Sequence, residues 1–184
     1  SIFIVSLFVG HIGIVIFSSL PWIRLTIQNL RLPDGRIVDD YPKLELRDYS
    51  MIFAETNENK IILERSYKHG FGNKTLVCPA GGVNPGENPL DTAKRELLEE
   101  TGYKSDNWIS YGQFVVNGNY GCGKANIYRA SKCFYVSEPI NDDLEDMDIQ
   151  LFDMNKLKQL ISDGKIKHFS TMMTIALATN PIFN

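Results

Sequence analysis

Residues 81–103 read GGVNPGENPLDTAKRELLEETGY and join a glycine-rich loop to a run that is typical of a helix. Pro89 is tolerated in the first turn of a helix, and Gly102 suits the position just after its end. The sequence therefore predicts a helix over Pro89–Thr101. Glycine in the preceding loop lets the backbone approach a metal ion or a phosphate closely.

Three glutamates share one face of this predicted helix. Because each helical residue advances by about 100°, Glu96, Glu99 and Glu100 fall within an arc of about 100°. Like charges at this spacing repel each other, and Mg²⁺ relieves the repulsion because it prefers oxygen ligands. A solvated acidic face is the alternative interpretation of three glutamates taken alone. The adjoining arc is apolar and is expected to face a core through Leu90, Ala93 and Leu97.

The same residues resemble the Nudix box at every position. The box is a glycine, five residues, a glutamate, seven residues, Arg-Glu, an aliphatic, any residue, Glu-Glu, any residue, a glycine and an aliphatic or aromatic residue. It matches from Gly81 to Tyr103. A weaker resemblance to the ADP-ribose pyrophosphatase branch extends over most of residues 21–178, including Leu63–Gly70 and Cys78–Gly82. The resemblance implies an α/β (α+β) fold, a Nudix α/β/α sandwich with a mixed sheet, preceded by an N-terminal antiparallel hairpin.

The resemblance also implies the metal site. One to three Mg²⁺ ions are expected to bind Glu96, Glu99 and Glu100, with the carbonyl of Ala80 as a further ligand, and Mn²⁺ can substitute. Such ions neutralise the charge of a diphosphate and lower the pKa of a bound water.

A carboxylate is expected to help that water attack one phosphorus atom. In the resembling branch this group comes from a later acidic loop, where Glu145 is the best positional match, and Glu99 is the second catalytic candidate. Asp146 and Asp148 are alternatives, and a role as a solvated loop residue stays open for Glu145.

Other residues are expected to bind substrate or support the site. Arg65 is a candidate phosphate contact, with a plain salt bridge as the alternative; Tyr120 is a candidate for stacking on a base. We expect His69 to be a structural loop residue rather than a base. Four residues are expected to be structural or to lie behind the metal ligands: Gly81, Glu87, Arg95 and Gly102. Of these, we expect Arg95 to pair with a glutamate rather than to touch substrate.

The leading functional hypothesis is Mg²⁺-dependent hydrolysis of ADP-ribose to AMP and ribose 5-phosphate. Hydrolysis of another nucleotide, such as an ADP-sugar, a dinucleotide or an oxidised nucleotide, is the second hypothesis. A non-catalytic Nudix domain that senses nucleotide is the third, and the intact box argues against it. ADP-ribose enzymes commonly carry a proline about 15 residues beyond the box, and residues 117–123 contain none. This departure leaves the exact substrate open.

Composition bounds the partners. The formal net charge of −3 and 43% hydrophobic content are typical of a globular protein and argue against a general nucleic-acid binder. The three cysteines lack metal-ligand spacing, so we expect reduced, mostly buried thiols, with a Cys122–Cys133 pair as the alternative. The expected partners are a small nucleotide and, from the resemblance, a second copy of the chain, and the expected location is cytoplasmic.

The chain is expected to comprise an apolar segment at 1–20, a β-hairpin at 21–46 and a Nudix domain at 47–184. Segment 1–20 has three open interpretations: a membrane anchor, which alone would add a membrane partner, a buried strand or helix, or translated sequence upstream of the true start. Alternation and turn residues predict the remaining elements. We expect strands at 23–30, 36–46, 49–54, 60–65, 75–77, 108–116, 125–136 and 149–152, and further helices at 155–162 and 170–178.

Overall fold

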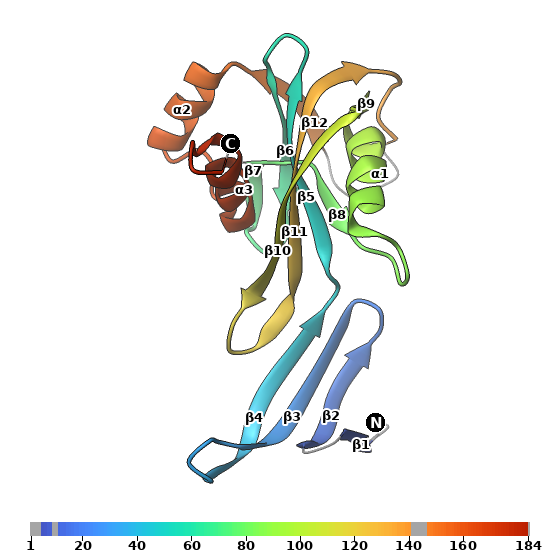
Figure 1. Cartoon of the computed structure of the whole chain (residues 1–184), viewed down its shortest axis with the longest axis vertical. Coiled ribbons are helices and arrows are strands. Elements are labelled where there is room, and N and C mark those ends of the chain that lie inside the picture. The colour runs from blue at the N-terminus through green and yellow to red at the C-terminus, as the bar shows by residue number, and fades with distance from the viewer. Residues whose placement is uncertain (1–4, 9–10, 141–146, 184) are drawn as a thin grey trace. The chain divides into compact units, whose positions relative to one another are not determined.

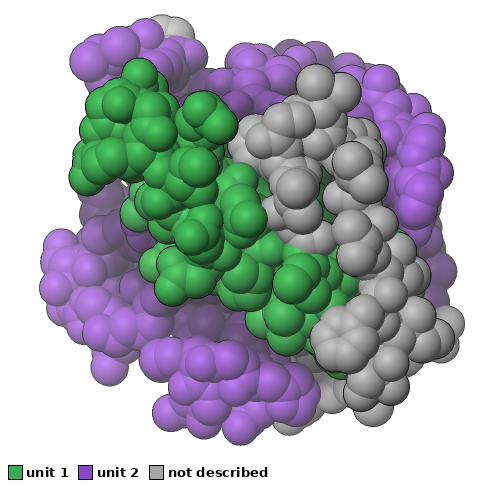
Figure 2. Space-filling model, turned by 90° about the horizontal axis from the view of Figure 1, so that it is seen from below, with its two compact units in different colours: residues 1–48, 115–124 green, residues 49–114, 125–184 purple. Residues whose placement is uncertain are grey.

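The computed structural model describes residues 5–8, 11–140 and 147–183, which form two compact units (Figure 1). Unit 1 comprises residues 1–48 and 115–124, and unit 2 comprises residues 49–114 and 125–184 (Figure 2). The glutamate-bearing stretch lies wholly within unit 2.

Unit 1 is built on an antiparallel sheet. The predicted hairpin is present: β3 (Ile23–Arg31) pairs with β4 (Ile37–Leu46). Its turn is fixed by Asp34, whose carboxylate accepts the backbone N–H of Arg36 at 3.0 Å. Two earlier strands extend this sheet, β1 (Val5–Phe8) and β2 (His11–Ser19).

Segment 1–20 therefore forms strands where it is described, and most of the side chains described in β2 are exposed. Phe17 is 54% exposed and Ile16 is equally so, because no helix covers this sheet among the described residues of unit 1. None of the helices in the described parts of the chain has the length and apolar character needed to span a membrane.

Unit 2 is built around β5 (Tyr49–Thr56), whose side chains are almost all buried. It pairs in parallel with β11 (Gly121–Tyr135) and antiparallel with β6 (Ile61–Lys68), so the sheet is mixed, as predicted. The other strands attach to these three: β7 (Asn73–Val77) and β12 (Met147–Phe152) to β6, β8 (Ala80–Gly82) to β5, and β9 (Tyr103–Lys104) and β10 (Asn107–Asn117) to β11.

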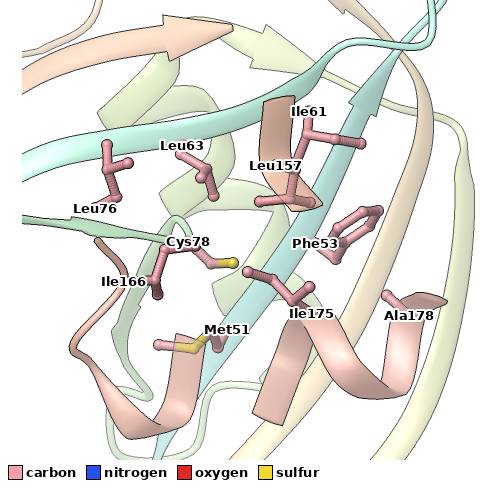
Figure 3. Close-up of a cluster of buried hydrophobic side chains, with 10 residues drawn as sticks. All are labelled: Met51, Phe53, Ile61, Leu63, Leu76, Cys78, Leu157, Ile166, Ile175 and Ala178. Carbon is pink, nitrogen blue, oxygen red and sulfur yellow. The ribbon is translucent and has the colours of Figure 1, made fainter. Parts of the chain in front are cut away.

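Helices cover both faces of this sheet (Figure 1): α1 (Pro89–Thr101) on one face, and α2 (Met154–Ser162) with α3 (Phe169–Thr179) on the other. The predicted α/β/α arrangement is confirmed. Alternate residues of β5 divide between two cores, because successive side chains of a strand point to opposite faces. Met51 and Phe53 pack with the α2 and α3 side (Figure 3), and Ile52 packs with Ala93 and Leu97 of α1.

Helix α1 begins and ends where its sequence predicts. The side chain of Asn88 caps the first turn by accepting the N–H of Leu90 at 2.9 Å. Gly102 adopts the left-handed conformation with φ of 75° and donates its N–H to the carbonyl of Leu98. The Ser50 hydroxyl donates to the carbonyl of Pro89 at 2.7 Å and ties the start of the helix to β5. The helix is thereby held at both ends.

Candidate active site

The guanidinium of Arg95 contacts three glutamates of the motif. Its Nη1 lies 2.6 Å from Glu96 Oε1 and 3.0 Å from Glu99 Oε2, and its Nε lies 3.1 Å from Glu87 Oε1. Glu99 is the most open of the three, with 41% of its side chain exposed against 13% for Glu96. One guanidinium therefore offsets much of the repulsion among the acidic side chains.

Strand β8, which precedes the loop to α1, lies directly against the carboxylates of Glu96 and Glu100. Glu100 Oε2 accepts the backbone N–H of Ala80 at 2.9 Å. A side chain at Gly81 would clash with the carboxylate of Glu96, because a Cβ built there lies 1.9 Å from its carboxyl carbon. Gly81 is required here for space rather than for an unusual backbone angle. Helix α1 and strand β8 thus bring the Ala80 and Gly81 backbone against two glutamates.

Burial makes the acidic side chains of this site unequal. It raises the pKa of Glu100 to about 7, an effect opposed by the Ala80 N–H and reinforced by the charge of Glu96. Burial also raises the pKa of Glu96, against the opposing effect of Arg95. Hydrogen bonds from Arg95, and then from the backbone of Asn84, lower the pKa of Glu87 to about 2. The lowered pKa keeps Glu87 ionised beside Arg95, whereas the raised pKa of Glu100 means that its ionised form is less favourable in the folded protein.

A cavity of about 320 Å³ opens beside this loop. It lies at the lower end of the volume range of small-molecule pockets. Strands β5 to β8 form most of its wall, and the residue before α3 completes it. The lining residues are Tyr49, Met51, Glu64, Lys68, Val77, Cys78, Ala80, Gly81, Gly82 and His168.

Three polar residues of this cavity were not among the sequence candidates: Glu64, Lys68 and His168. Glu64 is almost fully buried and makes a side-chain hydrogen bond with Glu100. A signal for two of them was present in the sequence. Successive side chains of a strand point to opposite faces, so Glu64 and Lys68 share one face of β6 with Ile62. Ile62 packs with α1. His168 carried no such signal, because its place depends on how the chain enters α3.

The other sequence candidates lie elsewhere. Arg65 is exposed on β6 and is not among the residues lining the cavity; it stands opposite the exposed Asp148 in the β6–β12 ladder. His69 packs edge-on against Tyr67. Tyr120 belongs to unit 1, where its ring stacks with that of Tyr41. Glu145 and Asp146 lie outside the described residues.

The donor chemistry of the motif fits a hard divalent cation. Its carboxylates and the Ala80 carbonyl are all oxygen donors, as Mg²⁺ requires, and Gly81 leaves the space beside Glu96 free of a side chain. Among the described residues, no three His, Cys, Asp or Glu side chains converge as a metal ion needs. Arg95 contacts Glu96 and Glu99, and the Ala80 N–H contacts Glu100.

Comparison with known proteins agrees with this geometry. The model of the NUDIX domain family matches residues 46–171. An ADP-ribose pyrophosphatase of Bacillus subtilis (strain 168) is 28% identical over 142 residues, covering 73% of this chain and 75% of its own. The methanol dehydrogenase activator of Bacillus methanolicus is 26% identical over 157 residues, covering 83% of each chain.

A solved structure of an ADP compounds hydrolase shares the fold, with a TM-score of 0.75 at 20% identity over 90% of this chain and 91% of that one. The chain therefore belongs to the Nudix family. Within it, the chain is a pyrophosphohydrolase of the ADP-ribose pyrophosphatase-like kind.

Proposed function

We propose that this protein hydrolyses the diphosphate of ADP-ribose, or of a closely related ADP-sugar, with Mg²⁺ as its cofactor. One observation carries the proposal: Glu96 and Glu100 of α1 lie against the Ala80–Gly81 backbone, and this backbone lines a cavity that Lys68 also lines. This juxtaposition supplies oxygen ligands on one side and a cation on the other, as a diphosphate requires. The similarity to an ADP-ribose pyrophosphatase supports the choice of substrate.

The positions of the side chains support the following roles. Glu96, Glu99 and Glu100, with the Ala80 carbonyl, would hold Mg²⁺, which when bound would neutralise phosphate charge and acidify a water molecule. Arg95 and Glu87 would orient the glutamates, and Gly81 and Gly102 would keep the loop and helix in place. Lys68 would bind a phosphate oxygen.

Three further assignments rest on the resemblance and remain part of this proposal. Glu145, or Glu99 in its place, would take the proton from the attacking water. Arg65 would contact phosphate and Tyr120 would stack on the base.

The experiment is a turnover screen with the intact chain. ADP-ribose, ADP-glucose, an oxidised nucleotide and a dinucleotide tetraphosphate are each incubated with Mg²⁺, with Mn²⁺ or with EDTA, and the products are separated by chromatography. We expect AMP and ribose 5-phosphate from ADP-ribose with either metal and no turnover in EDTA. Tight nucleotide binding without turnover of any compound would instead favour a sensing domain.

We also propose that the protein forms a homodimer through unit 1. Unit 1 exposes a set of large apolar side chains in β2, in the β2–β3 turn and in β4, and exposed apolar surface can mark an interaction site. We call this set the exposed apolar residues of unit 1; it consists of Ile14, Ile16, Phe17, Leu20, Trp22 and Ile37. The three free cysteines support a reducing, cytoplasmic location.

A further inference from the structure

His168 also lines the cavity of unit 2, and it comes from a different part of the chain than the glutamate motif. His168 is the N-cap residue of α3 and is half-buried. Its Nδ1 lies 3.0 Å from the hydroxyl oxygen of Thr171. That hydroxyl is fully buried and accepts the backbone N–H of Cys78 at 3.2 Å. The imidazole ring is therefore anchored to both α3 and the residue that follows β7.

This anchoring fixes which nitrogen can meet a ligand. Thr171 Oγ1 can accept the Cys78 N–H and at the same time donate its own hydrogen to Nδ1 of His168, and Nε2 is then the ring nitrogen left to meet a ligand. Burial, and then the charge of Lys68, lower the pKa of His168, which favours the neutral ring, and donation from Thr171 to Nδ1 would place the ring hydrogen on Nε2. In this tautomer His168, which lines the cavity, has a free hydrogen-bond donor on a ring held by Thr171.

We propose that His168 recognises the substrate by donating this hydrogen bond to an oxygen of the group attached to the diphosphate. The inference deepens the proposed function and rests on it. Lys68 lies within electrostatic reach of both Glu100 and His168. A phosphate beside Lys68 would therefore lie near both Glu100 and His168. Both halves of an ADP-sugar bear hydroxyl groups, so the accepting oxygen can belong either to the nucleoside or to the sugar.

The test compares two amides of different reach at position 168. His168→Asn keeps an acceptor near Thr171 but loses the distal donor, whereas His168→Gln places an amide N–H near the position of Nε2. With ADP-ribose and Mg²⁺, we expect His168→Asn to raise KM about tenfold, the effect of one lost hydrogen bond to a ligand, with kcat within about threefold. His168→Gln should restore KM to within about threefold of the parent. Phe169→Ala is the matched control, since Phe169 is 72% exposed and absent from the cavity wall.

A binding measurement separates this inference from the proposed function. The affinity for α,β-methylene ADP-ribose, measured by calorimetry, should fall about tenfold in His168→Asn alone. Product inhibition identifies the source, because His168→Asn should weaken inhibition by only one of AMP and ribose 5-phosphate. Unchanged KM and affinity in His168→Asn, or equal weakening by both products, would overturn the inference while active parent enzyme upholds the function. A parent that binds the analogue through His168 but does not hydrolyse ADP-ribose would overturn the function alone.

Discussion

Glu100 is the residue on which metal binding and catalysis should depend most directly. It is held by the Ala80 N–H and buried beside Glu96, so an uncharged amide would keep its shape but not its anionic oxygen. We expect Glu100→Gln to weaken Mn²⁺ binding and to lower kcat by about 100-fold or more, a few kcal/mol of lost stabilisation. Electron paramagnetic resonance titration with Mn²⁺ and a turnover assay measure the two effects separately. If this variant binds Mn²⁺ with the affinity of the parent, Glu100 is not a metal ligand.

Glu145 should behave in the opposite way if it acts on the attacking water. Glu145→Gln is expected to leave Mn²⁺ affinity nearly unchanged and to slow hydrolysis of ADP-ribose by about 100-fold, the usual contribution of a general base. The same two assays apply, with Glu138→Gln as the control carboxylate ahead of the acidic loop. Turnover like that of the parent would rule out Glu145 as the base and turn attention to Glu99, Asp146 and Asp148.

Glu87 gives the protein a defined response to acid. Its pKa is about 2 in the folded protein, chiefly because Arg95 donates to it, against an ordinary value of 4.5. A lowered pKa means that this ion pair stabilises the fold fully above pH 4.5 and that the gain is lost as pH falls towards 2. The difference in unfolding free energy between the parent and Glu87→Gln should therefore be constant from pH 7 to about 5 and shrink below it. Denaturant titrations at each pH measure this difference; one that grows in acid would contradict the assignment.

Gly102 controls where helix α1 ends. A side chain there must adopt φ of 75°, and its Cβ would lie 1.9 Å from the carbonyl oxygen of Ser137. We expect Gly102→Ala to lower the unfolding free energy by about 2 to 4 kcal/mol, from backbone strain and overpacking together. Gly86→Ala is the matched control, because Gly86 has φ of 79° and open space around it; it should cost about 1 kcal/mol. Urea unfolding that finds the two variants equal would show that the clash is relieved.

The elements of this fold differ in how far their sequence predicts them. The signals for α1 are local, namely Pro89, the glutamate spacing and Gly102, so both of its ends could be predicted. The β3–β4 hairpin was predictable from its turn and alternation. The short strands β8 and β9 were not, because three and two residues carry too little periodicity. The cavity could not be predicted either, because it needs β6 and the start of α3, which are far apart in sequence, to meet.

We expect the protein to be a dimer that a single charged substitution in unit 1 dissociates. Phe17 and Ile16 belong to the exposed apolar residues of unit 1 and are each 54% exposed. We expect the parent to have the mass of a dimer in multi-angle light scattering at micromolar concentration, and Phe17→Asp to have that of a monomer, since burying an unpaired carboxylate is costly. Glu58→Asp, in the exposed β5–β6 turn, should leave the dimer intact. A parent that is monomeric would contradict the proposed assembly.

The parallel pairing of β5 with β11 determines which strand pairings can form first while the chain is being synthesised. Met51 pairs with Ile127, and the whole glutamate motif with α1 is synthesised between them. During translation β5 can join β6 and β8 at once, but its other edge waits for the second half of the chain. Such long-range pairing forms slowly, and an exposed apolar strand edge meanwhile invites wrong partners. A nascent chain halted before β11 therefore carries every glutamate of the motif and an open β5 edge, and a chaperone that covers this edge would protect it.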